Sequence, residues 1–331
     1  MNNEFRGKTI LVTGGTGTIG SEIVRQLLSY APKQLRVLSR DETRQYYLQE
    51  ELEYPDNLRL LIGDIRDRDR LDLAFKGVDI IFHAAAMKHV PHCEYNPYEA
   101  VKTNILGSQN VIDMAIKHNV KKVIGISTDK AVNPSNVLGT SKLMMEKLFT
   151  NANYCYGKID TLFSCVRFGN IAWSNGSVFP LWKQQAETKK RIRVTDKDMT
   201  RFFISRKEAI NLVLRASVLS GGGEIFILKM KSAPLTAVAE LFIKKYFPNE
   251  NINIEIIGNR AGEINHEELF DKQDKYRKIF SDNEMFIIVP ALALPEPIRE
   301  PVIYPGFKEV TGEVSYSSER EIDLKKIEEV V

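Results

Sequence analysis

"TGGTGTIG", at residues 13–20, is the stretch of sequence that decides the fold. The residues before it, 8–13, are rich in β-branched side chains and predict a buried strand. After it, four apolar residues share one face of a predicted helix: Ile19, Ile23, Val24 and Leu27. A glycine-rich turn between a strand and a helix is typical of dinucleotide-binding proteins, because glycines let the backbone approach a pyrophosphate at the positive helix end. With both flanking elements present, this interpretation is favoured over a purely structural turn.

Strand and helix patterns alternate through the first half of the chain. Further strands are predicted at the short apolar runs 35–38, 58–62, 78–82, 123–126 and 161–166. Strands separated by helical segments predict an α/β fold with a Rossmann-type, doubly wound parallel sheet. Residues 1–170 are expected to form this dinucleotide-binding domain, and residues 171–331 a smaller C-terminal substrate-binding lobe. A helix and a strand near 206–229 are expected to return to the first domain.

The residues at the predicted strand ends indicate where a dinucleotide lies, because ligands of such sheets bind beyond the carboxyl ends of the strands. The predicted cofactor-binding residues are Gly14, Gly17, Thr18, Ile19, Gly20, Ser39, Arg40, Asp64, Ile65, Ala84 and Ala85. After the second strand, Ser39 and Arg40 precede Asp41, and Arg44 follows one helical turn later. This order favours a ribose 2′-phosphate and therefore NADP. In the alternative, Asp41 binds the 2′-hydroxyl group and Arg40 faces solvent.

Composition excludes several other classes of protein. A net charge of +3 over 331 residues, with one dense basic run at 189–193, gives no reason to expect a nucleic-acid partner. No stretch of about 20 apolar residues is present, so no membrane span is expected. The three cysteines and five histidines show no metal-ligand spacing, so no metal is expected and a reducing cytoplasm is the predicted location.

Five motifs give the chain a resemblance to a known family, from residue 8 to the tail. They are TGGTGTIG, HAAAMKHVPHCE, STDKA followed by G-x-S-K, RFGN and MTRFF. Together they resemble the extended short-chain dehydrogenase/reductase superfamily, and within it the soluble UDP-N-acetylglucosamine 4,6-dehydratases of polysaccharide biosynthesis. The resemblance implies a homo-oligomeric lyase that binds a UDP-sugar and uses NADP. It leaves open whether the configuration at C5 of the sugar is inverted or retained.

The resemblance also implies roles for residues 127–142. Such an enzyme oxidises C4 of the sugar, removes water across C5 and C6, and returns the hydride to C6. Asp129 is expected to act as the general acid at O6, Lys130 as the base at C5, and Thr128 as a partner of O4. Lys142 is expected to hold the nicotinamide ribose. The alternative, a solvated Asp129-Lys130 turn, is disfavoured by its place at the end of a buried strand.

Leu138 departs from the family pattern. Many relatives carry a tyrosine here, four residues before the lysine, and its phenolate takes the O4 proton. With leucine, the acceptor could be Asp129, Lys130 or water. The other Tyr-x-x-x-Lys match begins at Tyr154, which is expected in a loop because the helix carrying Lys142 should run from about 136 to 151. That helix is expected to bury Met144, Met145 and Leu148.

The predicted substrate-binding residues come from the second half of the chain, apart from Lys88. By resemblance they are Lys88, Asn170, Ser177, Val178, Thr195, Arg201, Arg260 and Glu263. Arg201 and Arg260 are the natural partners of the diphosphate, because a guanidinium group pairs with phosphate through two hydrogen bonds. In the alternative, Arg260 forms a surface ion pair. The proline-rich tail after Pro295 is expected to be irregular and to close over the substrate lobe.

The main hypothesis is therefore an NADP-dependent nucleotide-sugar 4,6-dehydratase. Two alternatives remain open at the level of the sequence. The first is an epimerase or 4-reductase of the same fold. The second is a non-catalytic NADP-binding protein, which the leucine at position 138 suggests.

Overall fold

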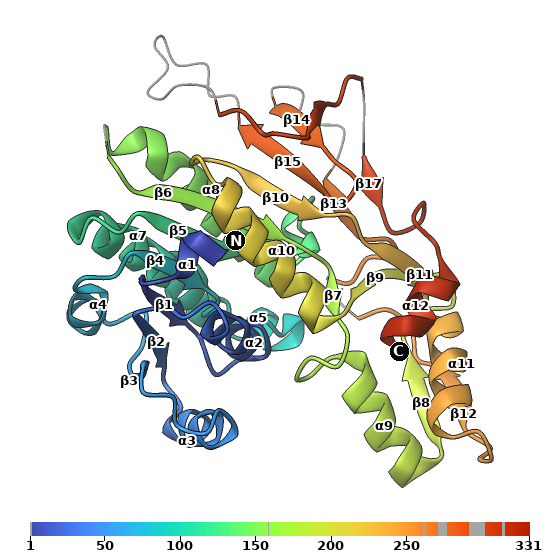
Figure 1. The fold of residues 1–331 in the computed structure, drawn as a ribbon. Helices are drawn as coiled ribbons and strands as arrows, with labels where there is room; N and C mark the ends of the chain where they lie inside the picture. The colour runs from blue at the N-terminus through green and yellow to red at the C-terminus, as the bar shows by residue number, and fades with distance from the viewer. Residues whose placement is uncertain (1, 158, 261, 271–276, 291–301, 313–314) are drawn as a thin grey trace.

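The computed structural model describes residues 2–157, 159–260, 262–270, 277–290, 302–312 and 315–331. Its central feature is a sheet in which seven parallel strands lie side by side (Figure 1). In spatial order they are β3 (Leu58–Ile62), β2 (Gln34–Ser39), β1 (Thr9–Thr13), β4 (Ile80–His83), β5 (Lys122–Ile126), β6 (Leu162–Arg167) and β10 (Ile225–Leu228). The first six have the 3-2-1-4-5-6 order of a doubly wound fold, which confirms the predicted fold class.

Helices cover both faces of this sheet. On one face, α2 (Thr18–Leu28) and α10 (Arg206–Leu219) pack against each other and against the strands. The other elements of the first half include α3 (Glu42–Glu51), α4 (Arg68–Phe75), α5 (Val90–Tyr95), α6 (Pro97–Ala100), the π-helix η1 (Val101–Leu106), α7 (Gly107–Lys117) and α8 (Val137–Cys155). Of these, α8 packs on β6 and α7, and α7 packs on α4.

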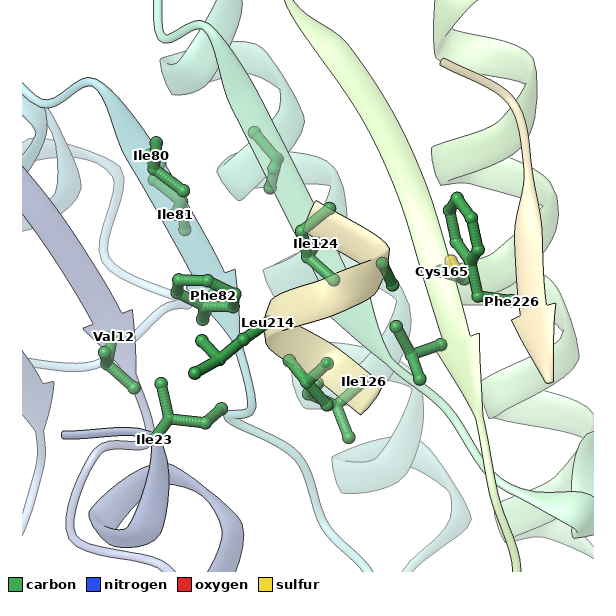
Figure 2. Close-up of a cluster of buried hydrophobic side chains, with 14 of the residues drawn as sticks. Val12, Ile23, Ile80, Ile81, Phe82, Ile124, Ile126, Cys165, Leu214 and Phe226 are labelled. Carbon is green, nitrogen blue, oxygen red and sulfur yellow. The ribbon is translucent and has the colours of Figure 1, made fainter. Parts of the chain in front are cut away.

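The core between α10 and the sheet explains why the strands are almost continuously apolar. Leu214 of α10 lies among side chains from α2, β4 and β5, such as Ile23, Phe82 and Ile126 (Figure 2). All four side chains are buried. A parallel strand covered by helices on both faces has no solvated side, so alternation of polar and apolar residues is lost. β10 joins the same sheet by pairing in parallel with β6.

A second hydrophobic core lies in the C-terminal half. It is built around Phe179, Trp182 and Phe242, and it includes Ile327 and Val331 near the C-terminus. The contributing elements are α9 (Val178–Lys189), β8 (Arg191–Val194), β9 (Thr200–Ile204), β11 (Lys231–Pro234), α11 (Leu235–Tyr246), β12 (Asn253–Ile256) and α12 (Leu324–Val330). They gather at one end of the molecule (Figure 1).

The predicted irregular tail is wrong for the residues that the structure describes. Within the tail, β16 (Lys308–Glu309) pairs with β14 (Arg277–Ser281), β17 (Tyr316–Ser317) pairs with β13 (Glu268–Phe270), and α12 packs on α11. Just before the tail, β14 and β15 (Met285–Pro290) extend the main sheet in antiparallel fashion from β10. Tyr304 is buried, and its hydroxyl group donates to Glu224 at 2.9 Å. Ile287 and Ile288 of β15 are fully buried. Their backbone N–H and C=O groups find hydrogen-bond partners because β15 pairs with β10 and β14. Pro295, Pro297 and Pro301 lie outside the described residues.

Two details of the helix that carries Lys142 also differ from prediction. α8 begins after its N-cap Asn136, as expected, but continues to Cys155, so Tyr154 lies on the last helical turn and not in a loop. Met145 is buried, whereas Met144 is 46% exposed, because neighbouring helical residues point to different faces. Among the described residues, no helix is both long and apolar enough to cross a membrane.

Truncating Trp182 tests whether the second core is a stabilising unit. Trp182 is fully buried, and its indole nitrogen donates to the Arg193 carbonyl oxygen at 2.8 Å. Trp182→Ala should lower the free energy of unfolding by about 3–5 kcal/mol, because the cavity and the lost apolar contacts both cost stability. Denaturant unfolding measures this. Leu181→Ala on the same helix is the matched control, since Leu181 is exposed and should cost about 0.5 kcal/mol or less. Equal losses in the two variants would contradict a tightly packed second core.

Candidate functional site

A cavity of about 1020 Å³ opens beyond the carboxyl ends of the parallel strands. It brings together residues that are far apart in the sequence. Predicted cofactor and catalytic residues that line it are Gly14, Gly17, Thr18, Ile19, Gly20, Ser39, Arg40, Asp64, Ile65, Ala84, Ala85, Thr128, Lys130 and Lys142. From the predicted substrate-binding set, Lys88, Asn170 and Ser177 line it too. The two sets therefore share one cavity.

The glycine-rich turn leaves room for a ligand at the start of α2. Gly14 has a φ of +66°, and a Cβ atom there would lie 2.7 Å from backbone atoms of Ala85. The N-cap of α2 is Gly17, and no side chain caps this helix end. The first backbone N–H groups of α2 are thus left for a ligand, and the positive end of a helix favours an anion. These features fit the pyrophosphate of a dinucleotide.

The end of β2 carries the groups that distinguish the two nicotinamide cofactors. Asp41 is the N-cap of α3: it accepts from the Arg44 backbone N–H group at 3.0 Å, and its carboxylate pairs with the Arg44 side chain at 3.3 Å. Arg40 is 63% exposed and lies 3.6 Å from Asp64. Arg40, Asp41 and Arg44 all line the cavity, and the Asp41 carboxylate is already engaged by α3 and by Arg44.

The Thr128-Asp129-Lys130 segment follows β5 as a short 3₁₀ turn, η2 (Asp129–Ala131). The Asp129 carboxylate is buried, and its Oδ1 accepts from the Thr128 hydroxyl group at 2.8 Å and from the Lys130 Nζ at 3.1 Å. Lys130 lines the cavity, whereas Asp129 lies directly beneath it. The turn is therefore no solvated loop, because its carboxylate is enclosed by protein.

Sequence analysis missed Glu267, the residue before β13 (Glu268–Phe270). Its buried carboxylate accepts from Lys130 Nζ at 2.7 Å and from the Asn170 side-chain amide at 3.0 Å, and it pairs with Arg201 Nε at 3.2 Å. In sequence it stands 137 residues from Lys130 and carries no motif of its own. It stands in the polar run Asn265-His266-Glu267-Glu268, which gives no sign that one of these carboxylates is buried.

Burial and the four neighbouring charges set the protonation of this cluster. Burial and the negative Glu267 raise the pKa of Asp129 to about 7. Burial would also raise the pKa of Glu267, but Lys130 and Arg201 outweigh it and lower this pKa to about 2. Burial would lower the pKa of Lys130, but the two carboxylates, Asp129 and Glu267, outweigh it and raise this pKa. Near neutral pH, Asp129 is therefore the group of this cluster that gains or loses a proton most easily.

Lys142 and Leu138 lie one turn apart on α8. Burial lowers the pKa of Lys142 to about 8, and its ammonium group donates to the Ile126 carbonyl oxygen at 2.5 Å. Leu138 lines the cavity but belongs to a small apolar cluster with Cys93 and Ala100. Tyr154 does not replace the missing phenol, because its ring lies against Gly223, away from the residues that line the cavity.

The remaining predicted substrate-binding residues are not among those that line the cavity. Val178 follows Ser177 at the start of α9, and the Thr195 hydroxyl group donates to the Met199 sulfur atom. Arg260 is 51% exposed and lies 4.0 Å from Glu263, so this loop carries an accessible guanidinium group. Arg201 is only 11% exposed and is occupied by Glu267.

Gly14→Ala tests the glycine-rich turn as the binding site of a dinucleotide. The methyl group would collide with the Ala85 backbone, and φ of +66° is unfavourable for alanine. Binding of NADPH, measured by calorimetric titration, should weaken at least tenfold. Gly7→Ala is the control, because Gly7 also has a positive φ but open space around it, so binding should persist. Unchanged affinity in Gly14→Ala would place the dinucleotide elsewhere.

Comparisons with known proteins identify the family of this chain. Residues 10–289 match the family described as "Polysaccharide biosynthesis protein". An "uncharacterized membrane protein" of Methanocaldococcus jannaschii is 50% identical over 295 residues, 88% of each chain. "UDP-N-acetylglucosamine 4,6-dehydratase (inverting)" of Campylobacter jejuni is 43% identical over 292 residues, 88% of this chain and 85% of that protein. The solved structure of "Pen" from Bacillus thuringiensis is 41% identical, with a TM-score of 0.90 and coverage of 98% and 97%. The chain therefore belongs to the polysaccharide biosynthesis protein family of the extended short-chain dehydrogenase/reductase superfamily.

Proposed function

We propose that this protein is an NADP-dependent nucleotide-sugar 4,6-dehydratase that acts on UDP-N-acetylglucosamine. One observation carries the proposal: an acid and a base stand next to each other, at Asp129 and Lys130, beside the cavity that the glycine-rich turn lines. The Campylobacter relative bears the name of this activity. A buried carboxyl group whose pKa is raised to about 7, next to a lysine that lines the cavity, favours a catalytic role over a non-catalytic one.

The cluster can supply both proton transfers of a dehydration. A bound nicotinamide cofactor would supply the hydride acceptor for oxidation at C4 and the hydride donor for reduction at C6. Between these events, Lys130 must be neutral to take the C5 proton, and Asp129 must be protonated to give its proton to O6. The raised pKa of Asp129 favours its protonated form, so the remaining requirement is that the Lys130 ammonium group releases its own proton before Nζ takes the C5 proton. The C5–H and C6–O bonds then break, and the two carbons share the new double bond as water leaves.

Other residues bind and orient the sugar nucleotide. Lys88, Asn170 and Ser177 line the same cavity as the catalytic pair, which supports contacts to the substrate. The exposed Arg260 is available for the diphosphate, together with Val178, Thr195 and Glu263 nearby in the C-terminal half. For Arg201, engagement by Glu267 favours a role in holding the catalytic cluster over direct binding of phosphate.

Since Leu138 has no titratable group, a different group must accept the O4 proton.

Conversion of UDP-N-acetylglucosamine tests the proposed reaction. The protein with NADP should yield a product lighter by one water molecule, detected by mass spectrometry. Lys130→Ala should abolish this product, because no other amine contacts both carboxylates of the cluster among the described residues. Lys76→Ala is the control, since Lys76 is exposed and lies outside the cavity.

Other outcomes of the same assay would contradict the proposal. A product of unchanged mass but altered configuration would identify an epimerase, and net consumption of NADPH would identify a 4-reductase. Cofactor binding without turnover of any UDP- or GDP-sugar would favour a non-catalytic protein.

The cofactor preference can be tested at the end of β2. Arg40→Ala and Arg44→Ala should each weaken NADPH binding about 10- to 100-fold, because one lost charge-assisted contact costs about 1.5–3 kcal/mol. Binding of NADH should change little, because it lacks the 2′-phosphate. Calorimetric titration measures both, with Arg68→Ala, which lies outside the cavity, as the control. Tighter binding of NADH than of NADPH by the wild-type protein would refute the proposed preference.

A further inference from the structure

The backbone of Glu267 and the side chain of its partner Arg201 are each anchored by several hydrogen bonds. Its backbone N–H group donates to the Ser318 hydroxyl group at 2.9 Å, and its carbonyl oxygen accepts from the Ser318 N–H group at 2.8 Å. Arg201 likewise donates to three carbonyl oxygens, those of Thr200, Ile264 and Asn265. These contacts fix the segment through its backbone, in addition to the contacts that the carboxylate makes.

The carboxylate of Glu267 faces the catalytic pair. Oε1 accepts from Lys130 Nζ at 2.7 Å and lies 3.2 Å from Arg201 Nε, while Oε2 accepts from the Asn170 amide at 3.0 Å. Both oxygens therefore have donors, two of which are cationic. A buried carboxylate in this situation stays ionised, because two positive neighbours compensate for the lost hydration.

The two oxygens of Asp129 are in very different surroundings. Oδ1 accepts from the Thr128 hydroxyl group, from the Lys130 backbone N–H group at 2.8 Å and from Lys130 Nζ. Oδ2 is buried and has no hydrogen-bond donor among the described residues. An ionised oxygen without a donor is costly in a buried site, whereas a protonated one carries no charge. Oδ2 is therefore the natural place for a proton on Asp129.

The charges around Asp129 favour the same form. Lys130 comes from its own turn, Glu267 from the segment before β13, and Arg201 from β9. Arg201 pairs with Glu267, and Lys130 contacts both carboxylates. When two carboxylates lie close together, one of them tends to remain protonated. Glu267 pairs with two cations and Asp129 with one, so Asp129 is the one that keeps the proton.

We infer that Glu267 is a positioning residue for the dehydration: its buried carboxylate fixes the Lys130 nitrogen and keeps the neighbouring Asp129 in its protonated, acid form. This inference rests on the proposed function, because it assigns Asp129 to protonation of O6 and Lys130 to the C5 proton. Lys130 Nζ contacts Glu267 Oε1 and Asp129 Oδ1. Lys130 also lines the cavity, so the side of Nζ that faces neither carboxylate is open to a substrate there. Glu267 thus acts through two other residues and needs no contact with the sugar.

Titration of Asp129 in the ligand-free protein tests the inference without any turnover. The carboxyl resonance of isotope-labelled Asp129, assigned with Asp129→Asn, should titrate near pH 7 in the wild-type protein, where the pKa is raised to about 7. In Glu267→Gln the midpoint should fall by at least about one pH unit, a tenfold change in proton affinity, because the repelling charge is gone. Glu268→Gln is the matched control. Its carboxylate faces Asn133 at 2.9 Å instead, so the midpoint should stay where it is.

The pH dependence of turnover gives a second readout. Asp129 acts as an acid, so activity falls as pH rises through its pKa. In Glu267→Gln this fall should move to lower pH, so that the variant loses at least about tenfold more activity at pH 8 than at pH 6 relative to wild type. Glu267→Asp, which restores the charge, should move the profile back toward wild type. Glu268→Gln should keep the wild-type profile.

The outcomes separate the inference from the function on which it rests. If the wild-type protein releases no water from any nucleotide sugar, the proposed function fails, and the titration still decides whether Glu267 controls Asp129. If wild type is active but Glu267→Gln leaves the Asp129 midpoint unchanged, the inference is wrong. A loss of activity by the same factor at every pH would also overturn it, because a merely structural role scales the profile without moving it.

Discussion

The parallel pairing of β1, β4, β5 and β6 is the constraint on which the site depends. Parallel strands end at the same edge of a sheet, so whatever follows each strand is brought to one place. The glycine-rich turn follows β1, Ala84 and Ala85 follow β4, and the Thr128-Asp129-Lys130 turn follows β5. The apolar core under these strands sets the positions of all three. The residues proposed to bind the cofactor and those proposed to be catalytic therefore meet at one cavity.

The second constraint is electrostatic. Two carboxylates and two cations are enclosed around Lys130, and removing one partner from such a cluster leaves an uncompensated charge. Near neutral pH, burial and Glu267 make Asp129 the group that changes protonation most easily. The enclosed cluster thus favours general acid–base chemistry over simple structural pairing. Replacing tyrosine by Leu138 removes one titratable group from the lining but leaves this balance intact.

The C-terminal segments complete the site, although they lie far away in the sequence. Glu267 precedes β13 and is anchored by Ser318, and the loop before it places Gly262 against Ser135 and Asn136. Tyr304 and Tyr316 pack the last third of the chain on the main sheet through hydrogen bonds to Glu224 and Met230. The lobe that is expected to hold the sugar thus also fixes the charges beneath the catalytic turn.

The sequence by itself determined the elements whose signals are local. Apolar runs and the glycine-rich turn predicted the parallel sheet, and Asn136 marked the start of α8 because a capping side chain acts within one helical turn. Placement of the Thr128-Asp129-Lys130 turn at a strand end followed from the same pattern. The limits of prediction appeared where no local pattern exists: α8 runs past its expected end, and the tail forms strands and a helix.

Only the tertiary structure decided which charges meet. Glu267 and Arg201 approach Lys130 from segments that are separated from it by 137 and 71 positions, and no periodicity or spacing encodes such a contact. The sequence placed Lys130 next to Asp129 alone, whereas folding adds the Glu267 carboxylate as a second partner. The physical reason is that a side chain's protonation depends on burial and on neighbours within a few ångströms. Those neighbours are fixed by packing across the whole chain.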